Sequence, residues 1–381
     1  MKKTVIVDTF SIGGFHEMFN TSFLYVILNS STSPLLYIAD KSAINAIVKL
    51  LKEDQEFQGL SNRITFKPKN LPKGNSFYAI FFRYLFGTFL NIFYLLKFKS
   101  SRIVFPALNP VFAVFLKIIL RMLETEVYVV CHGELGYLFS TYKITSPLYW
   151  YSSFLKPFFR GTLPKNLKLI ILGPSIVQNF TRHYPNLTGN IVTMHHPYIF
   201  NESLPKVNKS GVMTRFGWVG VATQAKGFKI FDEITHYFSE KYPEQFSAHL
   251  IGWHNFETDE YPWIKFASGP NVFLDRNEFD KEVGILDYIL FFYDNRHYQF
   301  TASGAIFDAI QQDKFIIALR NDYFESVFNA CGPIGFLCDS KEEIYEVVEQ
   351  VMRGEVDLKQ FSVNLKAARY IFGAQQMKMI L

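Results

Sequence analysis

Two residues of the segment YQFTASGAIFDAI, which runs from Tyr298 to Ile310, could bind one polar ligand together. The segment tightens at Ser303-Gly304 and then becomes an apolar helical pattern that contains a single acid, Asp308. If a helix begins near Ser303, Gly304 and Asp308 lie four residues apart and share one face. The start of a helix suits a phosphate, and a carboxylate can accept hydrogen bonds from two vicinal hydroxyls such as those of a ribose. The ordinary alternative for Asp308 is an acid on the solvent face of an amphipathic helix.

A lysine earlier in the chain could bind the same kind of ligand. In RFGWVGVATQAKGFKIFDEI, a predicted strand ends at Gly220, a loop follows, and Lys226-Gly227 leads into a predicted helix. Phosphate sites use a glycine turn, a lysine and backbone N–H groups at the carboxyl end of a strand. Because many strand–helix turns contain Gly and Lys, an ordinary exposed lysine is the alternative. A lysine, a helix start and a carboxylate, in this order, suit a nucleotide diphosphate.

Polar residues also follow two predicted strands in the first half of the chain. Gly13-Gly14, within SIGGFH, would allow a phosphate or a sugar to approach the backbone closely. Cys131-His132-Gly133-Glu134 follows the predicted strand Val127–Val130. If the protein deprotonates a substrate hydroxyl, His132 and Glu134 are the first candidates for the base, with His16 behind them. A loop histidine bonded to the backbone is the alternative for His132. No spacing of His, Asp and Glu indicates a metal site, and we expect no metal requirement.

An alternation of strands and helices must position these residues. The predicted strands are Thr4–Val7, Pro34–Ile38, Ile103–Phe105, Val127–Val130, Leu167–Leu172, Asn190–Met194, Thr214–Val219, Ala248–Ile251, Val272–Phe273, Tyr288–Phe292, Phe315–Ala318 and Phe336–Cys338. The predicted helices are Glu17–Leu28, Ser42–Leu51, Ser76–Lys97, Pro110–Leu123, Ser146–Phe159, Phe228–Lys241, Ser303–Gln311 and Asn321–Asn329. This alternation predicts parallel sheets with crossover helices.

The length of 381 residues predicts two domains rather than one core. The segment Phe200–Val212 is polar, contains Pro and Gly, and lies where the charge balance changes sign, so we interpret it as a linker. The expected division is a first domain over 1–199, a linker over 200–212 and a second domain over 213–365. The final segment, 366–381, could pack back on the first domain. We therefore predict an α/β protein of two Rossmann-like domains facing across a cleft, because such sheets bind ligands at the carboxyl ends of their strands.

Charge is distributed unevenly along the chain. Residues 1–200 contain 21 Lys and Arg against 9 Asp and Glu, whereas the remainder contains 18 against 25. A basic, aromatic first half indicates an anionic surface as partner. No nucleic-acid motif is recognisable, so a membrane surface is favoured over nucleic acid. Three sparse cysteines fit a reducing cytosol, and the N-terminus resembles a first strand more than a signal peptide. We expect a cytoplasmic protein, peripheral at the inner face of the membrane.

The stretch FFRYLFGTFLNIFYLLKF, from Phe81 to Phe98, bears on this expectation. Arg83, Asn91 and Lys97 interrupt the run of about 20 apolar residues that a span needs. An amphipathic helix lying on the bilayer is one interpretation, and a core helix with snorkelling cations is the other. The same two interpretations apply to LYWYSSFLKPFFR, from Leu148 to Arg160.

The second half of the chain resembles a known family. Gly220, Lys226-Gly227 and the later ASGAIFDAIQQDKFIIAL resemble the donor half of GT-B glycosyltransferases, particularly the family-4-like enzymes of bacterial surface polysaccharide synthesis. In that family a glycine ends the first strand of the second domain and a lysine six residues later contacts the donor diphosphate, as the spacing of Gly220 and Lys226 suggests here. An acid followed by Ala, here Asp308-Ala309, corresponds to the ribose-binding acid. The resemblance is clear over about Thr214–Val351 and weaker over Met1–Pro197.

Two positions depart from the family pattern. Val221 stands where the family often has an arginine, so the diphosphate would rely on Lys226 or on a substitute such as Arg296. Phe300 stands where the family often has a second acid beside the donor sugar, and this leaves retaining or inverting stereochemistry open.

The resemblance implies a glycosyltransferase that moves a sugar from a nucleotide-diphosphate sugar to a glycan or lipid-linked acceptor in surface polysaccharide synthesis. Its implied donor-binding residues are Gly220, Lys226, Arg296, Ser303, Gly304 and Asp308. The nucleotide sugar is then a co-substrate, and no other cofactor is implied. Three alternatives remain: a nucleotide-sugar 2-epimerase of the same fold, a non-catalytic two-domain ligand-binding protein, and a degenerate member that only scaffolds other enzymes.

Overall fold

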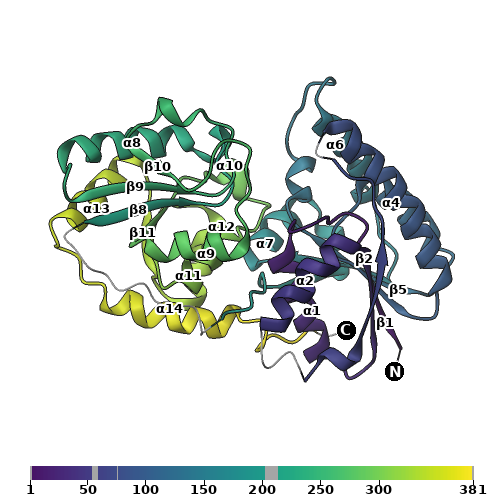
Figure 1. Ribbon diagram of the computed structural model, residues 1–381. Coiled ribbons are helices and arrows are strands. Elements are labelled where there is room, and N and C mark those ends of the chain that lie inside the picture. The colour runs from purple at the N-terminus through teal and green to yellow at the C-terminus, as the bar shows by residue number, and fades with distance from the viewer. Residues whose placement is uncertain (1, 54–58, 75, 202–212, 380–381) are drawn as a thin grey trace. The chain divides into compact units, whose positions relative to one another are not determined.

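The computed structural model describes residues 2–53, 59–74, 76–201 and 213–379, and its chain forms two compact units (Figure 1). Unit 1 comprises Met1–Ile199, Phe300–Ala302 and Phe372–Leu381, and unit 2 comprises Phe200–Gln299 and Ser303–Ile371. Most of the expected linker, residues 202–212, lies outside the described residues. Each unit is a Rossmann-like α/β domain.

Unit 1 is built on a parallel sheet in which the first and fourth strands are neighbours. Its strands are β1 Thr4–Val7, β2 Leu35–Asp40, β3 Ile64–Lys69, β4 Arg102–Phe105, β5 Glu126–Cys131, β6 Leu167–Leu172 and β7 Ile191–Met194. Its helices are α1 Glu17–Ser30, α2 Lys41–Glu53, α4 Phe77–Lys97, α5 Pro110–Ile119, α6 Pro147–Phe159 and α7 Pro174–His183, with short 3-10 turns at Ser61–Arg63, Glu134–Leu138 and Pro185–Asn190. Over the described residues the strand order is β3-β2-β1-β4-β5-β6-β7. The direction of winding therefore reverses between β1 and β4, which is where such sheets bind ligands.

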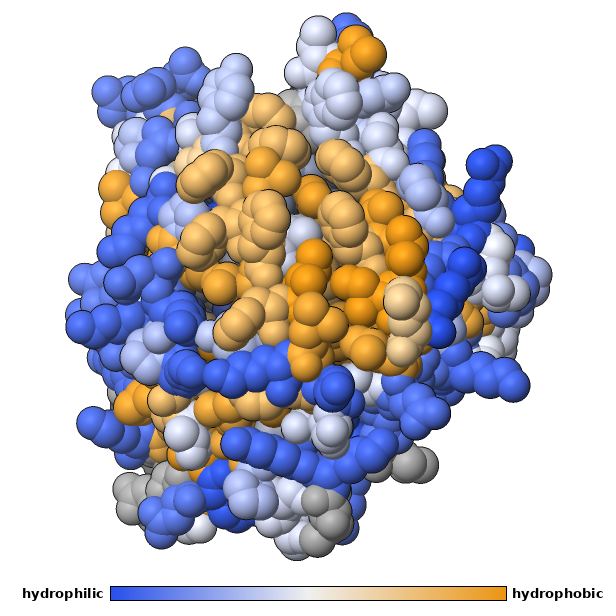
Figure 2. All heavy atoms as spheres, turned by 90° about the vertical axis from the view of Figure 1, so that its right-hand side faces the viewer, coloured by the Kyte–Doolittle hydropathy of each residue, from blue (hydrophilic) through white to orange (hydrophobic). Residues whose placement is uncertain are grey.

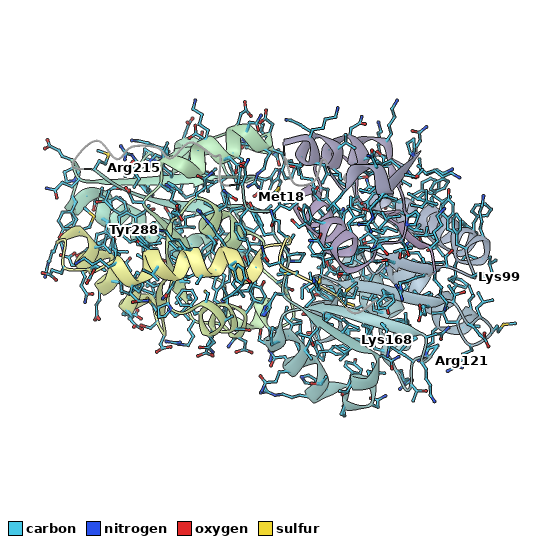
Figure 3. All side chains as sticks on the ribbon, turned by 90° about the horizontal axis from the view of Figure 1, so that it is seen from below. Met18, Lys99, Arg121, Lys168, Arg215 and Tyr288 are labelled. Carbon is cyan, nitrogen blue, oxygen red and sulfur yellow. The ribbon has the colours of Figure 1, made fainter. Side chains whose placement is uncertain are left out.

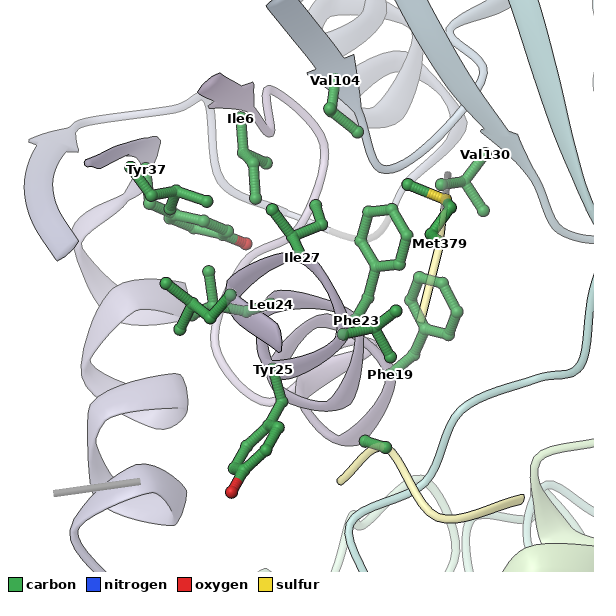
Figure 4. Close-up of a cluster of buried hydrophobic side chains, with 14 of the residues drawn as sticks. Ile6, Phe19, Phe23, Leu24, Tyr25, Ile27, Tyr37, Val104, Val130 and Met379 are labelled. Atoms are coloured by element: carbon green, nitrogen blue, oxygen red, sulfur yellow. The ribbon is translucent and has the colours of Figure 1, made fainter. Parts of the chain in front are cut away.

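Helix α1 forms the centre of the main apolar core of unit 1. Its buried side chains, among them Phe19, Phe23 and Leu24, pack against Ile6 of β1 and Val130 of β5 (Figure 4). The C-terminal segment closes this core, because Met379 is buried in the same cluster. The N–H of Tyr198 donates to Phe372, and the N–H of Ala374 donates to Tyr198. Helices α4, α5 and α6 pack side by side in unit 1.

Unit 2 repeats this architecture with its own parallel sheet. Its strands are β8 Thr214–Val219, β9 Phe246–Ile251, β10 Ile264–Phe266, β11 Tyr288–Phe291, β12 Phe315–Leu319 and β13 Gly335–Cys338. Its helices are α8 Phe228–Lys241, α9 Arg276–Ile285, α10 Asn295–Tyr298, α11 Ala305–Gln311, α12 Asp322–Cys331, α13 Lys341–Met352 and α14 Lys359–Phe372, with 3-10 turns at Gln224–Lys226 and Thr258–Glu260. In the part of the chain that is described, the strand order is β10-β9-β8-β11-β12-β13. The winding direction reverses between β8 and β11, and Figure 3 shows Arg215 and Tyr288 near the starts of these two strands.

Ion pairs and hydrogen bonds join several helices of unit 2 to one another. Lys341 of α13 pairs with Glu233 of α8 at 2.7 Å. On α9, Arg276 pairs with Asp308 of α11 at 2.9 Å, and the main-chain oxygen of Asp280 accepts a hydrogen bond from Gln312. Helix α11 therefore contacts α9 as well as the sheet.

Two strands were not expected from the sequence, and one expected strand does not form. Strands β3 and β10 lie at the edges of their sheets, and Val272–Phe273 is an exposed loop instead of a strand. Edge strands are half exposed, so they lack the continuous apolar run of a central strand, and β3 even contains Pro68, which an edge tolerates. The other predicted strands and helices are confirmed, with ends that shift by a few residues.

Candidate functional site

The loop after β8 forms a tight turn at the carboxyl end of the sheet in unit 2. Gly220 has a φ of 95°, and its N–H donates to Ile251 at the end of β9. Gly227 has a φ of 90°, and a Cβ atom at this position would lie 2.6 Å from the Cβ of Phe292. Only glycine accommodates both the left-handed backbone and this close packing. The two glycines hold the loop that carries Lys226 against the ends of β8, β9 and β11.

Lys226 lies at the point where the winding of the sheet reverses. Its Nζ is 5.7 Å from the ring centroid of Tyr293, a buried residue that follows β11. Among the described residues no carboxylate lies within ion-pair distance of Lys226, and burial lowers the pKa of its ammonium group to about 8. A half-buried cation without an acidic partner is suited to bind an anion.

Ser303 and Gly304 lie near Lys226, and Tyr293 contacts both the lysine and Ser303. Ser303 is buried and its hydroxyl hydrogen-bonds the phenol of Tyr293. Helix α11 begins at Ala305, two residues later than expected, with Gly304 as its N-cap and no side chain capping it. A Cβ placed on Gly220 would lie 3.7 Å from the Cβ of Ala305, so the β8 turn and the start of α11 are neighbours. The structure brings Gly220, Lys226, Ser303 and Gly304 to one edge of the sheet, and their binding of a donor diphosphate stays a prediction.

Asp308 has a partner that sequence reasoning did not find. Its carboxylate oxygen lies 2.9 Å from the guanidinium of Arg276, which also pairs with Asp280 at 2.7 Å. The side chains of Arg276 and Asp308 are both largely buried. Asp308 is therefore not an acid on a solvent face, and the ion pair holds its carboxylate in one orientation. Binding of ribose hydroxyls by Asp308 stays a prediction.

One predicted donor residue remains, Arg296, together with Val221 and Phe300, the two positions that depart from the family pattern. Arg296 lies in the short helix α10, and its side chain is outside what the structure describes. Val221 is exposed beside the β8 turn. Phe300 belongs to unit 1, where it is buried and its ring stacks on that of Phe139 with centroids 4.0 Å apart. The position where an acid would stand therefore has a packing role.

In unit 1 the loop after β1 is organised by a buried carboxylate. Asp8 accepts hydrogen bonds from the N–H groups of Phe10 and Ser11 and from the side chain of Asn20, at 2.9–3.1 Å. The N–H of Gly13, predicted to approach a phosphate or a sugar, donates to the hydroxyl of Ser42 at 2.9 Å. Gly14, in contrast, is exposed. Asp8 and Asn20 were missed as determinants of this loop, although an acid directly after a strand was a usable signal.

The three predicted base candidates lie close together in unit 1. The rings of His16 and His132 have centroids 4.8 Å apart, although the residues follow β1 and β5 respectively. Nε2 of His132 lies 2.9 Å from the carbonyl oxygen of Pro106, so it carries the proton and Nδ1 is the basic atom. Burial lowers the pKa of His132 well below its usual value, which keeps the ring neutral at pH 7.

Glu134 has a structural function beside these histidines. Its carboxylate accepts the N–H of His132 at 2.7 Å, and it also accepts from the backbone of Leu108 and from its own N–H. Burial nevertheless raises the pKa of Glu134 to about 7. The carboxylate thus links the loops after β4 and β5 and positions His132. Within the described residues, no group of three or more His, Cys, Asp or Glu side chains is arranged to hold a metal ion.

Comparison with known proteins identifies the fold. No family model and no curated protein matches the sequence. Solved structures match over nearly the whole chain. One is WaaG, a glycosyltransferase involved in lipopolysaccharide biosynthesis, with 12% identity, a TM-score of 0.59, and coverage of 97% of this chain and 95% of that one. A glycosyltransferase from Rickettsia africae matches with 13% identity, a TM-score of 0.61, and coverage of 98% and 95%.

A third similar structure was solved with a nucleotide. It is a mutant of TarM from S. aureus in complex with UDP, with 11% identity, a TM-score of 0.58, and coverage of 98% of both chains. At such identities the likeness concerns the fold, and it extends over both Rossmann-like units. The chain therefore has the GT-B fold of these glycosyltransferases.

Proposed function

We propose that this protein is a glycosyltransferase that moves a sugar from a nucleotide-diphosphate sugar to a glycan or lipid-linked acceptor in surface polysaccharide synthesis. The observation that carries the proposal is the position of Lys226. It lies beside Tyr293 at the point where the sheet of unit 2 reverses its winding, without a carboxylate partner in the described part of the chain.

The energetics of Lys226 favour a diphosphate as its ligand. A pKa of about 8 instead of 10.5 means that the free protein stabilises the charged form of Lys226, relative to its neutral form, by about 3 kcal/mol less than water does. A phosphate charge at about 4 Å attracts it by up to about 4 kcal/mol at an effective dielectric constant of 20. A diphosphate carries two such groups, so its binding offsets the desolvation of the lysine. After transfer the same cation stabilises the leaving nucleotide diphosphate.

The nucleotide end of the donor is assigned to α11. Asp308, one turn into this helix, would accept hydrogen bonds from the ribose hydroxyls, and Arg276 would hold its carboxylate in place. The similar TarM structure contains UDP, which supports a uridine nucleotide as the first probe.

The acceptor is assigned to unit 1. His132 is the first candidate for the base, because its ring is neutral at pH 7 and its Nδ1 is the basic atom. Glu134 is bonded to backbone N–H groups, so we assign it to the positioning of His132 and not to proton transfer. The proposal places the protein at the cytoplasmic face of the membrane, because the basic and aromatic first half suits an anionic surface.

The test measures nucleotide binding and turnover separately. A thermal-shift panel of nucleotide sugars on the full chain is expected to raise the melting temperature for one donor class, because that ligand binds only the folded state. Addition of membranes that contain the acceptor is expected to release free nucleotide. An epimerase would convert the donor sugar without net release of free nucleotide. A scaffold would neither convert the donor nor release nucleotide. Absence of any shift across the panel would refute the proposal.

A further inference from the structure

Helix α4 turns an apolar face outward. Six of its large apolar side chains are exposed, with Tyr78 at 80% and Phe89 at 73%; the others are Phe82, Phe86, Phe93 and Leu96. Their spacings of four, four, three, four and three residues place them in one stripe along the helix. Figure 2 shows a continuous apolar patch on this side of the molecule, bordered by hydrophilic side chains.

The opposite face of α4 is buried and contains polar side chains that are fixed by specific contacts. Arg83 donates to the carbonyls of Pro72 and Gly74 at 2.9 and 2.7 Å, and Asn91 accepts a hydrogen bond from Thr9 at 3.1 Å. A Cβ on Gly87 would lie 2.8 Å from the hydroxyl oxygen of Thr9, so the helix packs closely on the loop after β1. Rotating α4 to bury its aromatic side chains would leave buried polar groups without partners. The outward apolar face is therefore determined by the packing of unit 1.

The neighbouring helix α5 extends this surface. Phe115 and Ile118 are exposed, and so is Met122 just beyond the helix. Both helices follow parallel strands, so their C-terminal ends lie at the same side of unit 1. Cations gather there: Lys97 and Lys99 follow the α4 stripe, and Arg121 follows α5. Figure 3 shows Lys99 and Arg121 on this side.

Acidic side chains are scarce around this face. From Phe57 to Phe200 the acids are Glu124, Glu126 and Glu134. Glu126 is paired with Lys2 and Arg102, at 3.8 and 3.4 Å, and Glu134 is bonded to backbone groups. Glu124 is exposed two residues beyond Met122. Against this acid stand Lys97, Lys99 and Arg121, so the border of the apolar face carries a net positive charge.

We propose that the exposed face of α4 and α5 docks onto a lipid bilayer that contains anionic lipids, with α4 lying in the plane of the interface. A stripe of aromatic residues with a basic border suits acyl chains beneath anionic headgroups. A second copy of this chain fits less well, because two such faces would bring basic borders together. Helix α4 is long and apolar enough to cross a membrane by composition, but its buried face, with Arg83 and Asn91, makes contacts within unit 1.

This inference deepens the proposed function. It rests on that function only for the idea that the acceptor lies in the membrane. The test uses sedimentation of the full chain with vesicles of equimolar phosphatidylglycerol and phosphatidylcholine at low salt. The variant Phe82→Ser/Phe89→Ser is expected to bind these vesicles about tenfold more weakly or worse. Each phenylalanine buries apolar surface in the bilayer on docking, and serine does not. Phe273→Ser/Tyr370→Ser is the matched control, since it removes two exposed aromatic side chains from unit 2 and should bind as the original chain does.

The electrostatic part of the surface has its own variant. Lys97→Gln/Lys99→Gln is expected to weaken binding to these vesicles by about fivefold per lysine, and not to change binding to pure phosphatidylcholine. Failure of the unchanged protein to sediment with the anionic vesicles would overturn the proposal. Self-association that Phe82→Ser/Phe89→Ser abolishes, without vesicle binding, would overturn it in favour of a second copy. UDP affinity measured without lipid reports on the proposed function separately, and these variants should leave it unchanged.

Discussion

The guanidinium of Arg276 lies 2.9 Å from the carboxylate of Asp308 and joins helices α9 and α11 of unit 2. The same guanidinium pairs with Asp280 at 2.7 Å. Arg276 therefore pairs with Asp280 as well as with Asp308, and of these two acids Asp308 is the one assigned to the ligand. This arrangement allows a structural role of Asp308 to be separated from a binding role.

Asp308→Asn is expected to weaken UDP binding by about tenfold, because a neutral amide accepts weaker hydrogen bonds from ribose hydroxyls. Calorimetry with UDP and with 2′,3′-dideoxy-UDP gives the check, since the substitution should not change affinity for the dideoxy nucleotide. Asp280→Asn is the matched control, because it removes a partner of the same arginine and should affect stability alone. Equal losses for both nucleotides would contradict a ribose contact.

Lys226→Ala is expected to weaken UDP binding by about 10- to 100-fold, as removal of a charged hydrogen-bond donor does. In the original chain the affinity should fall as pH rises through about 8, because the free lysine then loses its charge. Lys226→Arg should bind with little change from pH 7 to 9, since an arginine stays charged. Lys229 is exposed on α8, so Lys229→Ala is the control and should bind UDP as the original chain does. If UDP affinity depends on pH in the same way in Lys226→Arg and in the original chain, Lys226 is not the titrating group.

His132→Gln is expected to slow transfer by about 10²- to 10⁴-fold while UDP affinity stays the same, because a general base acts on the acceptor and not on the nucleotide. Turnover with acceptor membranes and calorimetry with UDP measure the two quantities. His236→Gln, on the exposed side of α8, is the control. Full activity of His132→Gln would remove this histidine from the mechanism.

Glu134 is expected to make stability depend on pH. Its pKa is about 7 in the folded state and near 4.5 when unfolded, so between these values the folded state holds a proton that the unfolded state has lost. Stability should therefore fall as pH rises from 4.5 to above 7. Urea unfolding of Glu134→Gln should show a flatter dependence, and Glu257→Gln, at an exposed position, should follow the original chain. Parallel curves for Glu134→Gln and the original chain would show that this carboxyl is not the source.

Gly227→Ala is expected to destabilise unit 2 by about 1–3 kcal/mol, because alanine disfavours a φ of 90° and its Cβ would meet Phe292. Thermal unfolding measures the change. Gly269→Ala is the control, because its Cβ would meet nothing within 4 Å. A neutral Gly227→Ala would show that the β8 turn can relax.

The sequence by itself determined the α/β class and the central strands, because buried parallel strands are apolar runs such as Leu167–Leu172. The sequence also predicted the turn after β8 that carries Lys226, because Gly220 and Gly227 mark this turn locally. Edge strands β3 and β10 escaped prediction, since half-exposed strands need only a few apolar residues. Local sequence thus carries information wherever burial or a turn imposes a pattern on consecutive residues.

Only the tertiary structure decided which residues meet. Tyr293 reaches Lys226 because β11 pairs with β8, and Arg276 reaches Asp308 because α9 packs beside α11. The orientation of α4 is a further case, since its sequence suits both a core helix and a surface helix. The close approach at Gly87 and the buried bonds of Arg83 and Asn91 turn the aromatic stripe outward. Such contacts join residues distant in the chain, so their energies leave no periodic signal in the sequence.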